Sequence, residues 1–232
     1  MRLTCAALLF VLVVALGVIV RSGRTLAFDT RVHHAVRGDV PARYEDEEDD
    51  TTFRTRFMHL GPDIGTATIL VAPLTVLALR YLRHRRTAVL VGAATVGAAL
   101  VTLFLKGVFQ RTRGVSGCCR GYGHVFGYLF PSTHTVITIV TYGLLAYLIG
   151  TRLHGWRRVI PAAIVIIAVG FVGYSLVYLD THYATDVLGG LFLGSAILII
   201  ATLALRVTGR SMSVSDDATW AKDGVFPPVR HE

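Results

Sequence analysis

Residues 131–151 read PSTHTVITIVTYGLLAYLIGT. The stretch passes from a proline, two hydroxyl residues and a histidine into an uncharged apolar run, Thr135–Thr151. A helix start tolerates proline, because the first N–H groups have no partner inside the helix, and serine is a favoured cap. An apolar run of this kind, extended by its flanking residues, can cross a membrane as a helix. The stretch therefore predicts a transmembrane helix with polar residues at its entry.

The composition of the whole chain agrees with this prediction. The 232 residues are 53% hydrophobic and only 16% charged, and the mean hydropathy is +0.58, which is too apolar for a soluble domain. We therefore predict an all-α polytopic membrane protein, a bundle of six transmembrane helices. The six candidate runs are Leu3–Val20, Ile64–Leu79, Thr87–Leu105, Thr135–Thr151, Val159–Leu179 and Val187–Leu205.

The first apolar run has two interpretations. Arg2 precedes it, as in a secretory signal. The run is longer than a usual signal core, it is followed by Arg21 and Arg24, and no small-x-small cleavage site follows. We interpret it as a retained helix, with cleavage as the alternative.

Lysine and arginine in short loops predict the orientation. The loops 80–86 and 151–158 are rich in arginine, so we expect both to be cytoplasmic, together with both termini of a multi-pass cell-membrane protein. The connections 21–63, 106–131 and 180–186 then face outward. The middle connection is itself basic, against the usual tendency, which calls for a functional explanation.

The remaining segments suggest one domain and a tail. We expect residues 1–207 to form the membrane domain and residues 208–232 a polar cytoplasmic tail. The acidic run 45–50, EDEEDD, is typical of a solvated segment. Cys118 and Cys119 leave open a vicinal bridge, pairing with another chain, or free thiols. The net charge of +8 is divided among loops on opposite faces, which favours a phosphate-bearing or membrane partner and no nucleic acid.

Two groups of polar residues on the predicted outer side suit a phosphate. Lys106 and Arg113 are fixed cations for phosphoryl oxygens. Ser132 and Thr133, in the first turn of a helix, offer a hydroxyl and N–H groups at the positive end of the helix dipole. We predict these four as phosphate-binding residues.

Two histidines add chemistry beyond binding. His182 and Asp186 are four residues apart, so the carboxylate can hold one ring nitrogen while the other is presented as a nucleophile. His134 can act as a general acid. This set permits covalent phosphoryl transfer, and we expect neither a metal nor a cofactor.

The three motifs resemble those of the type-2 phosphatidic acid phosphatase superfamily, which are integral membrane lipid phosphatases. The family pattern is Lys, six residues, Arg-Pro; then Pro-Ser-Gly-His; then Ser-Arg, five residues, His, three residues, Asp. The counterparts here are KGVFQRTRG from Lys106, PSTH from Pro131 and SLVYLDTHYATD from Ser175. The resemblance implies that His182 attacks phosphorus, that His134 protonates the departing lipid alcohol and that Asp186 orients His182. It also assigns Lys106, Arg113, Ser132 and the Thr133 N–H to the phosphoryl oxygens.

The sequence departs from the family pattern at three positions. Gly114 replaces a proline, Thr133 a glycine and Leu176 an arginine that would hold phosphate. Arg111 or Arg120 is a candidate substitute for that arginine, and Asp180 is a nearby carboxylate that either repels phosphate, points to solvent or pairs with an arginine.

A transporter is disfavoured, because the centres of the predicted helices contain almost no ionisable residues. Two other function classes remain. The first is hydrolysis of a lipid phosphate, with phosphatidic acid, phosphatidylglycerol phosphate or a polyprenyl diphosphate as substrate. The alternative is a catalytically weak family member that binds a lipid phosphate or a partner protein.

Overall fold

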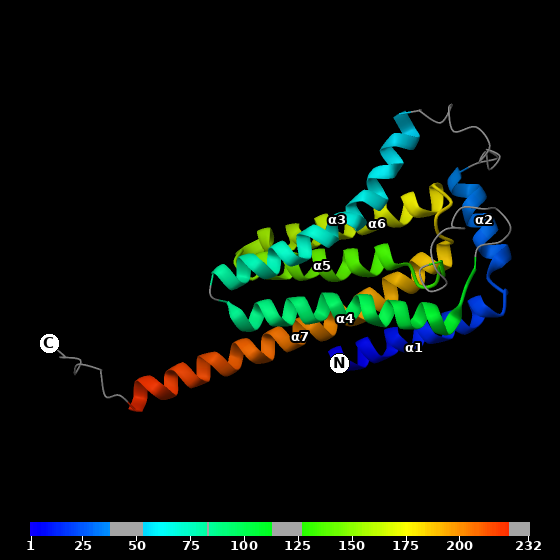
Figure 1. Cartoon of the computed structure of the whole chain (residues 1–232). Coiled ribbons are helices and arrows are strands. Elements are labelled where there is room, and N and C mark those ends of the chain that lie inside the picture. The colour runs from blue at the N-terminus through cyan, green and yellow to red at the C-terminus, as the bar shows by residue number, and fades with distance from the viewer. Residues whose placement is uncertain (38–52, 83, 113–126, 223–232) are drawn as a thin grey trace.

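The computed structural model describes residues 1–37, 53–82, 84–112 and 127–222, with backbone alone for Arg37, Thr55 and residues 209–222. Within these ranges the chain is helical, as predicted, and contains no strand (Figure 1). The elements are α1 (Arg2–Arg21), α2 (Leu26–Arg37), α3 (Phe53–Tyr81), α4 (Arg85–Phe109), α5 (Thr133–Gly150), the short 3-10 helix η1 (Gly155–Val159), α6 (Ile160–Tyr178) and α7 (Ala184–Lys222).

Six of the described helices are long and apolar enough to cross a membrane, which confirms the predicted bundle. Their candidate spans are Arg2–Arg21, Arg56–Tyr81, Arg85–Phe109, Thr133–Gly150, Gly155–Tyr178 and Ala184–Thr208. The second span begins earlier than the predicted Ile64, because α3 starts at Phe53 and includes the polar residues that precede the apolar run. Pro62 lies inside α3 and cannot donate a backbone hydrogen bond, so the helix can bend there. The first part of α3 leans away from the bundle (Figure 1).

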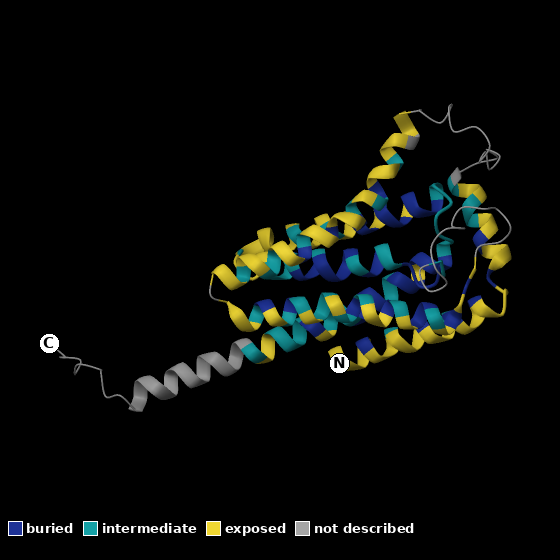
Figure 2. Cartoon of the chain, in the orientation of Figure 1, coloured by how far each residue is buried: buried dark blue, intermediate teal, exposed yellow. Residues whose placement is uncertain are grey.

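Helix α5 is the centre of the bundle. It packs against α3, α4, α6 and α7, while α1 covers α7. Half of its span is buried, the largest share among the six. The outer helices expose large apolar side chains such as Leu70, Phe104 and Ile166, as expected for a surface facing lipid. Much of the ribbon of α1, α3 and α4 is exposed (yellow in Figure 2).

The start of α5 is held tightly against α7. A Cβ built on Gly190 of α7 would lie 2.8 Å from Thr135 Cβ and 3.0 Å from the Ser132 carbonyl oxygen. Only glycine therefore fits at this crossing, as is common where membrane helices approach closely. This contact holds the second turn of α7 against the PSTH motif.

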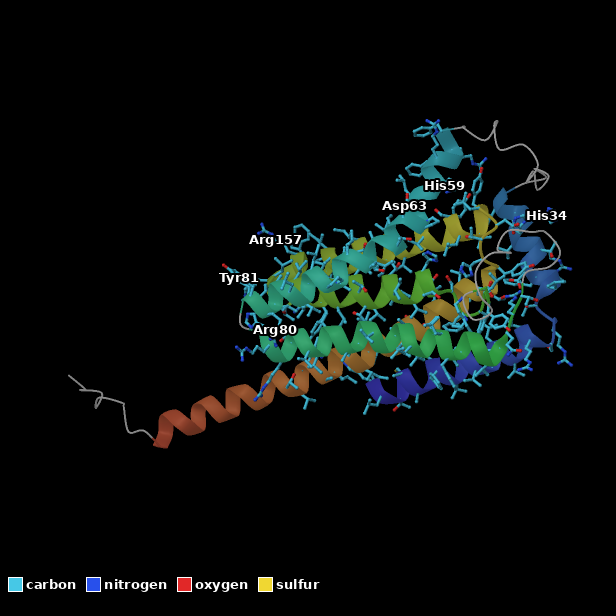
Figure 3. The ribbon with its side chains drawn as sticks, in the orientation of Figure 1. His34, His59, Asp63, Arg80, Tyr81 and Arg157 are labelled. Atoms are coloured by element: carbon cyan, nitrogen blue, oxygen red, sulfur yellow. The ribbon has the colours of Figure 1, made fainter. Side chains whose placement is uncertain are left out.

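The helix ends sort into two groups. Arg80, Tyr81 and Arg157 lie together at one end of the bundle, and His34 lies at the other (Figure 3). The end of α4, the start of α5, the end of α6 and the start of α7 meet at the His34 end, where α2 also lies (Figure 1). Helix α2 was not predicted: the outer connection 21–63 was expected as a loop, and it contains α2 and the first turns of α3.

Candidate active site

The PSTH motif begins α5, as the sequence predicts. Ser132 is the N-cap, and its Oγ accepts hydrogen bonds from the Thr135 N–H (3.5 Å) and the Thr135 hydroxyl (3.2 Å). The Ser132 N–H donates to the Asp186 carbonyl oxygen at 3.0 Å. Ser132 is fully buried, and Thr133, the first helical residue, is partly exposed. The serine thus joins the start of α5 to the start of α7.

His182 lies in the turn between α6 and α7, beside Asp186. Its Nδ1 is 3.6 Å from Asp186 Oδ2, and its side chain is about one-tenth exposed. The Tyr183 N–H donates to the same Oδ2 at 2.9 Å. A side chain that returns to the residue three positions earlier is the usual arrangement at a helix start. The local fold of α7 therefore places the carboxylate behind the histidine.

The two histidines of the predicted mechanism face each other. The ring centroids of His134 and His182 are 6.3 Å apart, and the ring planes are inclined by 72°. The buried Nδ1 of His134 has no hydrogen-bond partner among the described residues. The two rings reach this position from different elements, α5 and the α6–α7 turn.

Lys106 lies in the last turn of α4 and is buried. Its Nζ donates to the carbonyl oxygens of Tyr128 and Leu129, the latter at 3.4 Å. Its charge also acts on His134. The ammonium is therefore near the histidine pair and holds the segment that leads into α5.

Arg111, just beyond α4, makes contacts that the sequence did not suggest. Its Nη1 donates to Asp186 Oδ1 at 2.6 Å and to Thr185 Oγ1 at 2.7 Å, and its Nη2 donates to Asp29 Oδ2 at 2.6 Å. Its guanidinium carbon lies 4.2 Å from the centre of the Tyr183 ring. By its charge and place in the sequence Arg111 is a candidate for the missing phosphate-binding arginine, but in the structure two protein carboxylates hold it.

Asp29 is the site residue that sequence reasoning missed. It lies in the first turn of α2 and is buried, with the Thr185 N–H donating to Oδ1 at 2.9 Å and the Thr185 hydroxyl to Oδ2 at 2.8 Å. Its partners are 82 and 156 residues away in sequence. No local sequence pattern identifies such a residue. The available signal is an aspartate in the first turn of a short amphipathic helix, and this does not indicate its distant partners.

Comparisons with known proteins agree with the motifs. The family model described as PAP2 superfamily matches residues 87–210, which is more than half of the chain. The chain belongs to the PAP2 superfamily. Its fold is similar to the crystal structure of a transmembrane PAP2-type phosphatidylglycerolphosphate phosphatase from Bacillus subtilis. The TM-score is 0.67 and the sequence identity 18%, over 85% of this chain and 94% of that one. No curated protein matches the sequence. Membership supports a membrane phosphatase in general, acting on a lipid phosphate.

The departure from the PAP2 pattern at Leu176 has a structural consequence. Leu176 is buried and belongs to an apolar cluster with Val172, Val177 and Val187. Val32 and Val36 of α2 pack against this cluster. The side chain that replaces the PAP2 arginine therefore helps to attach α2 to the bundle.

Asp180, the carboxylate near the predicted phosphate site, faces α2. Its Oδ1 lies 3.7 Å from Nε2 of His33, in a partly exposed pair. From the sequence alone His33 is a surface residue outside the three motifs; in the structure it lies beside Asp180. The motif residues Arg113 and Gly114, and also Arg120, Cys118, Cys119 and the acidic run 45–50, fall outside the described residues.

Proposed function

We propose that this chain hydrolyses a lipid phosphate monoester or diphosphate at the extracytoplasmic face, through a phosphohistidine intermediate. The observation that carries the proposal is the pair His134 and His182, 6.3 Å apart between ring centroids, with Asp186 beside His182. This spacing suits one phosphoryl group flanked by a nucleophile and a proton donor.

In the first step His182 attacks the phosphorus. Its Nδ1 faces Asp186, so the lone pair of Nε2 forms the N–P bond. The bond from phosphorus to the leaving oxygen breaks, and His134 gives that oxygen its proton. The leaving group is the lipid alcohol for a monoester and the lipid phosphate for a diphosphate. The Asp186 carboxylate offsets the positive charge that develops on the His182 ring.

In the second step water releases the phosphate. His134, now without its proton, accepts one from the attacking water, and the N–P bond breaks as the new O–P bond forms. Inorganic phosphate leaves, and both histidines return to their starting forms. The same residue thus serves as acid and then as base.

Fixed positive groups would hold the phosphoryl oxygens. The buried Lys106 ammonium is close to His134, and the N–H groups of Thr133 and His134 belong to the first turn of α5, where no helix carbonyl is available to them. Arg113 and the Ser132 hydroxyl remain predicted ligands. These charges lower the barrier where negative charge spreads over the transferred group.

The position of the site supports a lipid substrate. It lies at one end of a bundle whose outer face is apolar, so an acyl or prenyl chain can stay in the bilayer while the head group enters. Phosphatidic acid, phosphatidylglycerol phosphate and a polyprenyl diphosphate are the candidates, and the Bacillus subtilis neighbour named for phosphatidylglycerolphosphate supports including that lipid. Arg80 and Arg157 at the opposite end support an outward-facing site with both termini cytoplasmic (Figure 3).

A panel of lipid phosphates in detergent tests the enzyme proposal. Phosphate release by the wild type is compared with His182→Ala and with the control His84→Ala, an exposed histidine of the α3–α4 turn. We expect release by the wild type and the control on at least one lipid, together with an acid-labile phosphoryl label on the protein. Equal release by the wild type and His182→Ala on every lipid would reject the proposal.

A second candidate function is favoured by the apolar Leu176. A weak family member that binds a lipid phosphate or a protein would lack the third-motif arginine, and Arg111 is held by Asp29 and Asp186. Comparing Leu176→Arg with the volume-conserving Leu176→Met separates the candidates. A gain in phosphate release with arginine alone would support the weak member, although a charge in this apolar cluster also lowers stability.

A further inference from the structure

A buried cluster of three charged side chains lies behind the histidine pair. The Arg111 guanidinium bridges the Asp29 and Asp186 carboxylates, with both N–O distances 2.6 Å. The two carboxylates are inaccessible to solvent, and the arginine side chain is 6% exposed. A charge in such a place is costly unless it is paired and hydrogen-bonded. All three groups therefore depend on one another.

The charges of the cluster do not cancel. Two carboxylates and one guanidinium leave one net negative charge, given that each group is ionised. With Arg111 alone, the charge that Asp186 presents to His182 would be largely neutralised. Asp29 supplies the second negative charge, which leaves Asp186 able to stabilise a positive His182 ring.

The cluster also fixes the orientation of Asp186. Arg111 holds Oδ1, while Oδ2 accepts the Tyr183 N–H and faces His182. Asp29 is itself tied to the start of α7 through the N–H and hydroxyl of Thr185. Helix α2 is thereby joined to the turn that carries the nucleophile.

From these contacts we infer that Asp29 and Arg111 are positioning residues of the phosphoryl-transfer site, acting on His182 through Asp186. The inference rests on the proposed function for its meaning in catalysis. It assigns α2, in the first outer connection, to the active site. It also assigns Arg111 to the orientation of the nucleophile rather than to the phosphate.

Neutralising Asp29 or Arg111 one at a time tests the inference, because the two changes should shift the titration midpoint of His182 in opposite directions. Asp29→Asn removes a negative charge, so protonation of His182 becomes less favourable and its titration midpoint falls. Arg111→Gln removes a positive charge, so the midpoint rises. We expect shifts of about one pH unit each way, and a double variant close to the wild type. The other titratable and charged groups of the site are unchanged in these variants. Asp186 and His134 lie beside His182, and Tyr183 and Asp180 belong to the same turn. His33 pairs with Asp180, and the charge of Lys106 acts on His134.

The midpoint is measured by NMR titration of isotope-labelled histidine in detergent, with the His182 signal assigned by its loss in His182→Ala. This readout needs no activity. The matched controls are Asp63→Asn and Arg31→Gln, exposed charges of α3 and α2, for which we expect no comparable shift. If Asp29→Asn fails to fold, Asp29→Glu is measured in its place. This variant keeps the negative charge, so we expect the His182 midpoint to stay at the wild-type value.

Shifts of the same sign in both single variants, or none, would overturn the inference. Where the wild type hydrolyses a lipid phosphate, we also expect each single variant to lower kcat by about 10-fold or more with KM within about 3-fold, because neither residue contacts phosphate. Opposite NMR shifts without hydrolysis by the wild type would reject the proposed function and keep the charge coupling. Hydrolysis by the wild type without NMR shifts in the variants would keep the proposed function and reject the charge coupling.

A separate feature lies at the other end of the bundle. Helices α6 and α7 both pack on α5 but scarcely touch each other there, and a cavity of about 1000 Å³ lies between the three helices. Its lining is mainly apolar, with Gly143, Val169 and Leu198 among the residues that form it. Arg158 and Arg206 line the same cavity, and Arg206 donates to the Tyr147 hydroxyl at 3.3 Å.

We propose that this cavity binds an anionic phospholipid, with an acyl chain against α5 and the phosphate at Arg158 and Arg206. The volume is at the upper end of usual ligand pockets, and the two guanidinium groups complement a phosphate. Basic pockets between membrane helices are known to bind anionic head groups. The site is distinct from the histidine pair and does not depend on the proposed function.

Thermal unfolding in nanodiscs of phosphatidylcholine, with and without phosphatidylglycerol, tests this site. We expect phosphatidylglycerol to raise the Tm of the wild type and of Arg157→Gln, a neighbouring arginine that does not line the cavity. The double variant Arg158→Gln with Arg206→Gln should lose more than about half of that rise. Equal Tm values in both lipids, or an equal loss in Arg157→Gln, would overturn the proposal.

Discussion

The ring of His134 lies directly against the backbone of Gly65. A Cβ built on Gly65 of α3 would fall 2.9 Å from His134 Cδ2 and 3.1 Å from its Cβ. The absence of a side chain at Gly65 therefore leaves the space that the ring of His134, the predicted general acid, occupies. Helix α3 contributes to the site through a missing side chain.

Gly65→Ala should lower activity more than stability. The added methyl group forces His134 to move, and a displacement of a catalytic group by about 1 Å can cost on the order of 100-fold in rate. We expect kcat to fall by about 10- to 100-fold, with a small change in Tm. Gly97→Ala is the control, because a Cβ there meets nothing within 4 Å. Equal kcat values in the two variants would contradict the prediction.

Gly190→Ala should destabilise the whole bundle. The new Cβ would lie 2.8 Å from Thr135 Cβ, and overpacking of this kind typically costs about 1–3 kcal/mol. Gly170→Ala provides the comparison, since a Cβ on that glycine of α6 meets nothing within 4 Å. Thermal unfolding in detergent measures both. A Tm of Gly190→Ala equal to that of Gly170→Ala would show that α5 and α7 do not meet as closely as described.

Much of this arrangement could be predicted from local sequence. Uncharged runs identify the six spans, because crossing a membrane requires a length of apolar helix that few other structures need. The proline and serine of PSTH mark the start of α5, and the four-residue spacing of His182 and Asp186 places the two together at the start of α7. These signals lie within a few residues of the feature that they predict.

The rest depends on contacts between distant segments. Asp29 and Arg111 are 82 residues apart, and a single aspartate in a polar connection gives no sign of its partner. Helix α2 is short, and its apolar residues Val32 and Val36 are buried only against the cluster around Leu176. The charge of Arg111 makes it a candidate substitute for the missing phosphate-binding arginine, but the buried carboxylates of Asp29 and Asp186 hold its guanidinium.

Ser132→Ala should reveal whether the serine acts mainly as a cap. Loss of an N-cap typically costs about 0.5–2 kcal/mol, so we expect a lower Tm, and Ser132→Thr should keep most of the stability. Both variants are measured by thermal unfolding and by kcat/KM. A rise in KM without a fall in Tm would instead assign the hydroxyl to the phosphate.

Lys106→Met should separate the charge of the lysine from its volume. The methionine fills a similar space but cannot donate to the carbonyl oxygens of Tyr128 and Leu129, nor present a positive charge near His134. Removing one electrostatic group of a preorganised site commonly costs about 100- to 1,000-fold in kcat, and we expect a loss in that range. Arg86→Met, an exposed residue of the opposite end, is the control. If Lys106→Met retains full kcat while its Tm falls, the ammonium supports only the segment before α5, and the phosphate must be held by other groups.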